Sequence, residues 1–161
     1  MKRWLLFLIL ALAPCLAFAE TLHGRVVDVA DGDTITLLLP DHRQERVRLA
    51  GIDAPESKQP YGEASKRHLF SLVYNRQVVV VTNKRDSYGR LIGKVLVDGA
   101  DACLAQIEAG LAWHYKQFEN EQSLEDRVAY RLAEEQALGA RRGLWAEPDP
   151  VPPWVWRRGQ R

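Results

Sequence analysis

The chain has 161 residues, of which 47% are hydrophobic and 27% are charged, an ordinary globular composition for one domain. The formal net charge is +1, from 22 Lys and Arg against 21 Asp and Glu. This balance excludes a global basic field, so any binding to a polyanion must depend on the local placement of Lys and Arg.

Residues 1–19 have the pattern of a secretory signal peptide. Two basic residues precede an apolar run, residues 4–12, which is too short to span a bilayer. Ala17 and Ala19 form a cleavage site of small residues, and we expect cleavage after Ala19. The mature protein is therefore expected in the periplasm or outside the cell, without a stable membrane anchor.

Cys15 offers an alternative, attachment of a lipid to the mature N-terminus. Pro14 stands where such a site needs a small Gly, Ala or Ser, so cleavage after Ala19 is favoured. Cys103 is then the one remaining cysteine, and an internal disulfide is excluded. The apolar neighbours of Cys103 predict a buried side chain rather than a catalytic thiol.

Three strands are predicted at the start of the mature chain, and they form a β-meander. The first covers residues 21–30, and the dipeptide Asp31-Gly32 is a strong hairpin signal. The second covers residues 34–39, where apolar and polar side chains alternate, and the third covers residues 44–52.

A helix, two strands and two further helices are predicted to follow. Helical spacing of apolar residues covers residues 62–76, and β-branched or apolar runs at 78–81 and 91–97 predict strands. Asp101 is a good N-cap for the next helix. Ser123 begins a capping-box pattern for the last one.

This order of elements predicts an α+β protein that is mainly β: a five-stranded barrel of the OB type with three helices. An open α+β sheet is the alternative. We expect one domain, residues 20–146, followed by a Pro-rich tail, residues 147–161, in which the prolines exclude a helix. Trp154 and Trp156 would anchor this tail on the domain or leave it as an adhesive arm.

The third predicted strand ends in a charged turn, Arg48-Leu-Ala-Gly-Ile-Asp-Ala-Pro-Glu56. Asp33 begins the neighbouring strand, so its carboxylate can converge with those of Asp53 and Glu56. Oxygen donors without nearby His or Cys favour a hard ion, Ca²⁺ or Mg²⁺, over zinc. Each acid alone is more typical of a solvated strand end, so the hypothesis depends on the combination.

Two arginines complete this set of charged residues. Arg48 lies on a predicted strand and Arg90 follows a predicted hairpin, and a guanidinium suits a phosphodiester because its planar fork binds two oxygens. Arg48 and Asp53 are an odd number of residues apart, so a flat strand would place them on opposite faces. Gly51 is the residue where a bulge or bend would bring them together.

Three segments in order resemble the staphylococcal nuclease (thermonuclease) family: Asp31-Gly-Asp-Thr34, Arg48 to Glu56, and Asp86-x-Tyr-Gly-Arg90. Each motif is weak alone, but three in register are specific, and the resemblance covers about residues 21–145. The family fold is an OB barrel with helices, in agreement with the predicted order of elements.

The resemblance implies a metal site and a base. Asp33 and Asp53 would bind Ca²⁺, or less readily Mg²⁺, through side-chain oxygens, and the backbone carbonyl of Ala54 would be a further ligand. Glu56 would orient or deprotonate the attacking water.

The resemblance also implies how the substrate is bound. Arg48 and Arg90 would hold the phosphate and stabilise the charge of the transition state. Tyr88 would line the nucleotide site, and Tyr115 is a second candidate for that role. Hydrolysis would break the bond to the 5′ oxygen and leave 3′-phosphate ends.

The predicted function is therefore that of an exported Ca²⁺-dependent nuclease, an endonuclease that acts on DNA or RNA as a monomer. The alternative is a non-catalytic OB-fold module that binds single-stranded nucleic acid or a protein partner.

Overall fold

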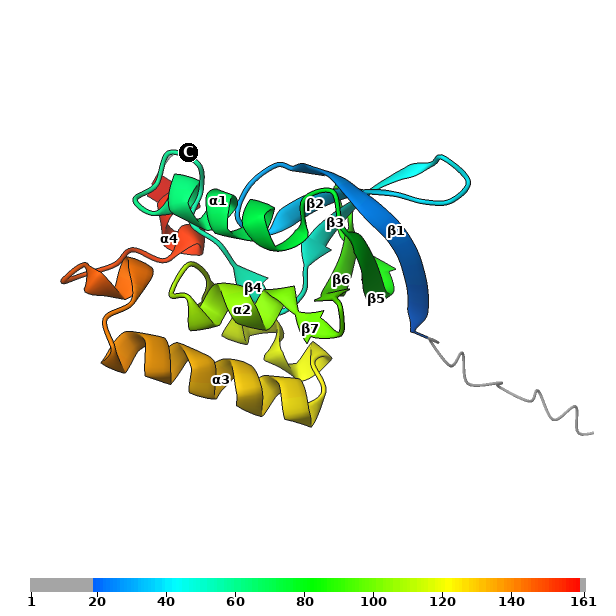
Figure 1. The fold of residues 1–161 in the computed structure, drawn as a ribbon. Helices are drawn as coiled ribbons and strands as arrows, with labels where there is room; N and C mark the ends of the chain where they lie inside the picture. The colour runs from blue at the N-terminus through cyan, green and yellow to red at the C-terminus, as the bar shows by residue number, and fades with distance from the viewer. Residues whose placement is uncertain (1–18, 160–161) are drawn as a thin grey trace, which may run out of the picture.

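The computed structural model describes residues 19–159, and residues 1–18 of the predicted signal peptide lie outside this range. Its centre is a closed barrel of five strands (Figure 1): β1 (Glu20–Val29), β2 (Thr34–Leu38), β3 (Gln44–Leu49), β5 (Gln77–Arg85) and β6 (Leu91–Val97). Neighbours in the order β3-β2-β1-β5-β6 are antiparallel, and a parallel pairing of β3 with β6 closes the barrel. The prediction of a five-stranded OB-type barrel is confirmed.

The strands form a barrel because apolar side chains alternate along them. In β6, buried residues at every second position alternate with half-buried ones, and β2 and β5 show the same period over most of their lengths. The inward-facing side chains fill the interior. Those with no exposed surface include Val26, Ile35, Leu37, Val47, Leu49, Val80 and Val95.

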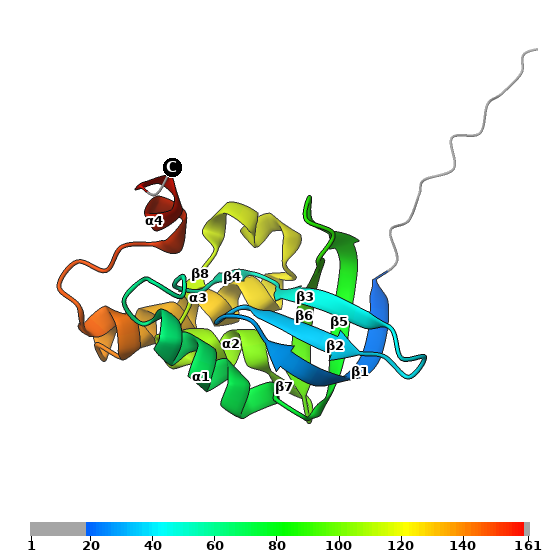
Figure 2. The ribbon, with the colours of Figure 1, turned by 90° about the horizontal axis from the view of Figure 1, so that it is seen from above.

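Three helices lie together on one side of the barrel (Figure 2): α1 (Gly62–Val73), α2 (Ala102–Glu108) and α3 (Leu124–Gly139). The predicted caps are present, because Asp101 accepts hydrogen bonds from the first backbone N–H groups of α2 and Ser123 accepts one from Asp126. Cys103 on α2 is fully buried, as predicted. Within residues 19–159, every helix is too short or too polar to cross a membrane.

The third predicted strand is divided in two. Strand β3 ends at Leu49, a two-residue turn follows, and the short strand β4 (Ile52–Asp53) pairs with β8 (Trp113–His114) instead of continuing in the barrel. The turn is possible because Gly51 adopts a left-handed backbone conformation, with φ of 74°. The remaining short elements are β7 (Ala100–Asp101), η1 (Lys116–Glu121) and η2 (Gly143–Ala146).

The prediction that the Pro-rich tail contains no helix is wrong. Residues Pro153–Gly159 form α4, so the described chain has a fourth α-helix besides the three predicted ones. Proline is tolerated at the first position of a helix, since that residue has no intrahelical partner for an N–H group. Pro153 is therefore where α4 begins, and the six residues of the helix after it are free of proline.

Candidate active site

One cleft, with a volume of about 400 Å³, is lined by every residue to which the sequence assigned a catalytic, metal-binding or substrate-binding role. It lies where β2 begins, where β3 ends and where the hairpin between β5 and β6 turns. Its walls are formed by Asp31, Asp33, Arg48, Asp53, Ala54, Pro55, Glu56, Asp86, Tyr88, Arg90, Ile92, Tyr115, Phe118 and Arg157.

The register of the barrel strands places Asp33 and Arg48 side by side. Thr34 of β2 is opposite Arg48 of β3, and Arg48 is in turn beside Ile92 of β6. The backbone N–H of Leu49 donates to the carbonyl oxygen of Asp33 over 2.8 Å. Arg48 and Asp33 are thus positioned by ladder hydrogen bonds of a rigid barrel rather than by a mobile loop.

The turn at Gly51 brings Arg48 and Asp53 to the same face. Nη2 of Arg48 donates to Oδ1 of Asp53 over 2.8 Å and to Oδ2 of Asp33 over 3.4 Å. The same oxygen of Asp33 accepts the backbone N–H of Ala54 over 2.9 Å, which connects the start of β2 to the end of β4. The prediction that a bend at Gly51 brings Arg48 and Asp53 together is confirmed.

Asp33 and Asp53 are buried at this end of the barrel, and Asp31 beside them is half-buried. Asp53 has no exposed surface, and burial raises its pKa, although the hydrogen bonds from Arg157 and the charge of Arg48 oppose the rise. Burial and the nearby charge of Asp33 raise the pKa of Asp31 to about 6. Gathered acids of this kind are stable in their charged form only beside cations.

The second predicted arginine is oriented by its own hairpin. Oδ1 of Asp86 accepts the backbone N–H groups of Tyr88 (2.9 Å) and Arg90 (3.0 Å), and Oδ2 accepts Nε of Arg90 over 2.8 Å. Nη1 of Arg90 reaches Oγ1 of Thr34 at 3.4 Å. Asp86 therefore fixes both the turn and the direction of the guanidinium toward β2.

The two predicted tyrosines line the cleft in different ways. Tyr88 is 84% exposed at the tip of its hairpin, where its ring lies 5.5 Å from the guanidinium carbon of Arg90. Tyr115, just before η1, lies 5.8 Å from the guanidinium carbon of Arg48. Each tyrosine thus places an aromatic ring beside one of the two arginines.

Two residues of α4 lie at this site: Trp154, which the sequence indicated only as an anchor of the tail, and Arg157, which the sequence did not indicate. Arg157 donates to both carboxylate oxygens of Asp53, over 2.7 and 3.2 Å, and to Oε1 of Glu56 over 2.6 Å. The ring of Trp154 stacks on that of Tyr115. The signal available was the clustering of Trp and Arg after Pro153, but no periodicity in the sequence connects that cluster to residues a hundred positions earlier.

The donor set fits a hard divalent cation in its chemistry. Asp33, Asp53 and Glu56 supply only oxygen, the donor type that Ca²⁺ binds. In the part of the chain described here, no three His, Cys, Asp or Glu side chains are arranged so as to hold an ion. Instead, Arg48 bridges Asp33 and Asp53, and Arg157 bridges Asp53 and Glu56. These three carboxylates already bind two guanidinium groups, so their position suits a cation.

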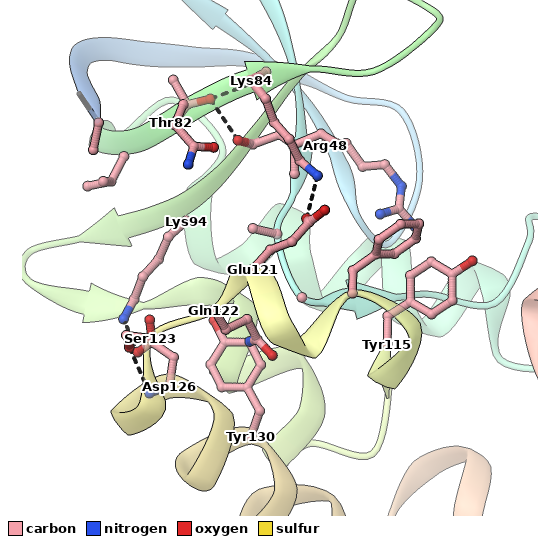
Figure 3. Close-up of a pocket in the computed structure, with 17 residues that line it drawn as sticks. Arg48, Thr82, Lys84, Lys94, Tyr115, Glu121, Gln122, Ser123, Asp126 and Tyr130 are labelled. Atoms are coloured by element: carbon pink, nitrogen blue, oxygen red, sulfur yellow. Dashed lines mark hydrogen bonds and ion pairs between the residues drawn. The ribbon is translucent and has the colours of Figure 1, made fainter. Parts of the chain in front are cut away.

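A second pocket of about 230 Å³ adjoins the cleft (Figure 3). The two share Arg48, Ile92, Tyr115 and Phe118. Two ion pairs line this pocket: Lys84 pairs with Glu121, and Lys94 pairs with Asp126 over 2.5 Å. The hollow surface therefore extends past Arg48 and is wider than one phosphate requires.

Known proteins are similar in sequence to this chain over most of its length. The profile of the family described as staphylococcal nuclease homologue matches residues 46–147, more than half of the chain. A protein of Escherichia coli O157:H7 named as an uncharacterized endonuclease is 42% identical over 137 residues, which cover 84% of this chain and 85% of that protein. A micrococcal nuclease of Shigella flexneri is 37% identical over 148 residues, with coverage of 86% and 82%. Protein ParB of Escherichia coli is 41% identical over 151 residues, with coverage of 88% and 82%. The chain belongs to the staphylococcal nuclease family, a family of nucleases.

Proposed function

We propose that this protein is a Ca²⁺-dependent phosphodiesterase that hydrolyses DNA or RNA and leaves 3′-phosphate ends. The observation that carries the proposal is the meeting of Arg48, Arg90, Asp33, Asp53 and Glu56 in one cleft of a nuclease-family barrel. The names of the relatives, an endonuclease and a micrococcal nuclease among them, support the same enzyme class.

Asp33 and Asp53 would hold the cation, together with the backbone carbonyl of Ala54. A bound Ca²⁺ polarises a phosphate oxygen and neutralises charge on it. Asp53 is suited to this role because its buried carboxylate already contacts two cationic groups, those of Arg48 and Arg157. Asp33 is suited because the backbone of Ala54 and the barrel register fix its direction.

Glu56 would accept a proton from the attacking water. It is the most exposed of the three acids, with 40% of its side-chain surface accessible, so water reaches it directly. Pro55, the residue before Glu56, fixes its own φ and holds Ala54 extended, which restricts how the chain enters Glu56. The new bond joins the water oxygen to phosphorus, and the bond from phosphorus to the 5′ oxygen breaks. That oxygen takes a proton from solvent and leaves as a hydroxyl, while the proton on Glu56 returns to solvent.

Arg48 and Arg90 would bind the scissile phosphate. They project from β3 and from the start of β6, so two planar guanidinium groups face the cleft from neighbouring strands. Negative charge that builds on the phosphate oxygens is stabilised most by donors that are already oriented, and Asp86 supplies that orientation for Arg90. The adjoining pocket offers room for a further nucleotide of the same strand.

Export to the periplasm or the medium, after cleavage at Ala19, is part of the proposal. It is supported by the composition of residues 1–19. We also propose that one copy of the chain suffices for activity, because every group assigned a role comes from a single cleft.

The chemistry of the product ends tests this function. A short single-stranded DNA and an RNA of the same sequence would be incubated with the protein and Ca²⁺, and the fragments analysed by mass spectrometry. Fragments that carry a 3′-phosphate and a 5′-hydroxyl are expected. Intact oligonucleotides that remain bound would favour a non-catalytic OB-fold module, and 3′-hydroxyl ends would contradict the proposed bond cleavage.

A further inference from the structure

Helix α4 is held against the mouth of the cleft by specific contacts. The rings of Trp154 and Tyr115 stack with centroids 5.3 Å apart and planes 12° apart, and Trp154 meets Trp113 edge-on at 5.7 Å. Before the helix, Nε2 of Gln59 donates to the carbonyl oxygen of Val151 over 2.5 Å. These contacts dock α4 on the domain.

Docking brings one cationic side chain of the tail onto the acids. Arg157 donates to Oδ2 of Asp53 over 2.7 Å, to Oδ1 over 3.2 Å and to Oε1 of Glu56 over 2.6 Å. Since Arg48 also donates to Oδ1 of Asp53, both oxygens of this carboxylate are engaged by guanidinium groups. Among the described residues, the side chain of the next residue, Arg158, hydrogen-bonds to the backbone oxygen of Trp154 rather than to an acid.

A divalent cation and Arg157 therefore require the same oxygens. A guanidinium that donates to both oxygens of Asp53 occupies the directions from which an ion would bind, and its positive charge repels one. In the same docked position, Trp154 covers the face of Tyr115 that a nucleobase would use. Helix α4 thus covers Asp53, Glu56 and one face of Tyr115 at the same time.

We propose that α4 is an autoinhibitory strap, in which Arg157 holds Asp53 and Glu56 until Ca²⁺ and polynucleotide displace it. This inference rests on the proposed function, because it assigns the same two acids to the metal and to the attacking water. In the closed state the acids are neutralised without an ion. In the open state they are released together with the ring of Tyr115.

Because Ca²⁺ binds only molecules in which the strap is open, the apparent dissociation constant equals that of the open site divided by the open fraction. If about nine molecules in ten are closed, the apparent dissociation constant is about tenfold above that of the open site. A change that opens the strap should therefore tighten Ca²⁺ binding, although it removes a contact rather than adding one.

The test compares Arg157→Gln with Arg158→Gln, which changes the net charge equally. Ca²⁺ binding to each purified protein would be measured by isothermal titration calorimetry without nucleic acid. Arg157→Gln is expected to bind Ca²⁺ about tenfold more tightly than the wild type. Arg158→Gln is expected to match the wild type.

A second pair of variants tests the docking itself. Trp154→Ala removes the stack on Tyr115 and is expected to tighten Ca²⁺ binding in the same direction, whereas Val155→Ala, at an exposed position, is not. Tryptophan fluorescence of the wild type is expected to change on Ca²⁺ addition, because Trp154 leaves its two aromatic neighbours. The change should be smaller in Arg157→Gln.

Two results would overturn the strap. If the wild type, Arg157→Gln and Trp154→Ala bind Ca²⁺ with equal affinity, α4 is not autoinhibitory, and the proposed function is unaffected. Failure of all the folded variants to bind Ca²⁺ would overturn the strap and the Ca²⁺ dependence together.

Discussion

Replacement of Arg90 by alanine is expected to lower turnover about 10²-fold or more, with a smaller change in KM. Arg90 points from the start of β6 toward Thr34, fixed by two contacts to Asp86. Such a group stabilises charge that develops on the phosphate only in the transition state, so its loss appears in kcat. Initial rates on a fluorescent single-stranded oligonucleotide, measured at saturating Ca²⁺, would show the effect. Arg48→Ala is expected to lose a similar factor.

The control for this prediction is Arg85→Ala. Arg85 contacts Glu45 and the carbonyl oxygen of Gly89 in the same hairpin, and it does not line the cleft. The change of charge is identical, so nonspecific attraction of the substrate is reduced equally. Equal losses in Arg85→Ala and Arg90→Ala would show that net charge, rather than a positioned guanidinium, sets the rate. Arg90→Lys should recover only part of the activity, because an ammonium lacks the planar fork.

Loss of the carboxylate at Asp33 is expected to affect the metal rather than the phosphate. Asp33→Ala, and more conservatively Asp33→Asn, should raise the Ca²⁺ concentration for half-maximal activity at least about tenfold, because one charged oxygen ligand is removed. Asn keeps an oxygen that can accept the backbone N–H of Ala54, so this variant separates charge from folding. Calcium titrations of the initial rate would measure the shift.

Asp41→Asn is the matched control for the Asp33 variants. Asp41 is an exposed acid in the turn before β3, where it pairs with Arg43 over 2.7 Å. It loses the same charge far from the cleft walls, so its Ca²⁺ dependence should follow the wild type. A shift of the same size in Asp41→Asn, or an unchanged calcium titration in Asp33→Asn, would argue that Asp33 does not bind the metal.

The barrel was predictable because its evidence is local. Alternation along β2, the β-branched run in β5 and the capping residues Asp101 and Ser123 each report on neighbouring positions in the sequence. The convergence of Arg48 and Asp53 was predictable in outline, because Gly51 is the residue that tolerates a left-handed turn. The pairing of β4 with β8 was not, since it depends on a contact with a segment about sixty residues later.

The tail shows the opposite case. The prediction of no helix assumed that every proline interrupts a helix. Pro153 instead stands at the first position of α4, where proline is tolerated. The contact of Arg157 with Asp53 spans 104 positions and involves two side chains of common type. Such a contact leaves no periodicity to read, and it becomes visible only when the segments are placed in space.

The most direct test of the account is a digestion of single- and double-stranded DNA and RNA in Ca²⁺, in Mg²⁺ or in chelator, with Glu56→Gln run beside the parent. We predict that the parent degrades at least one nucleic acid in Ca²⁺, that chelator stops it, and that Glu56→Gln is strongly slowed because the attacking water has lost its base. Absence of cleavage by the folded parent in every divalent cation, or full activity in chelator, would contradict the account.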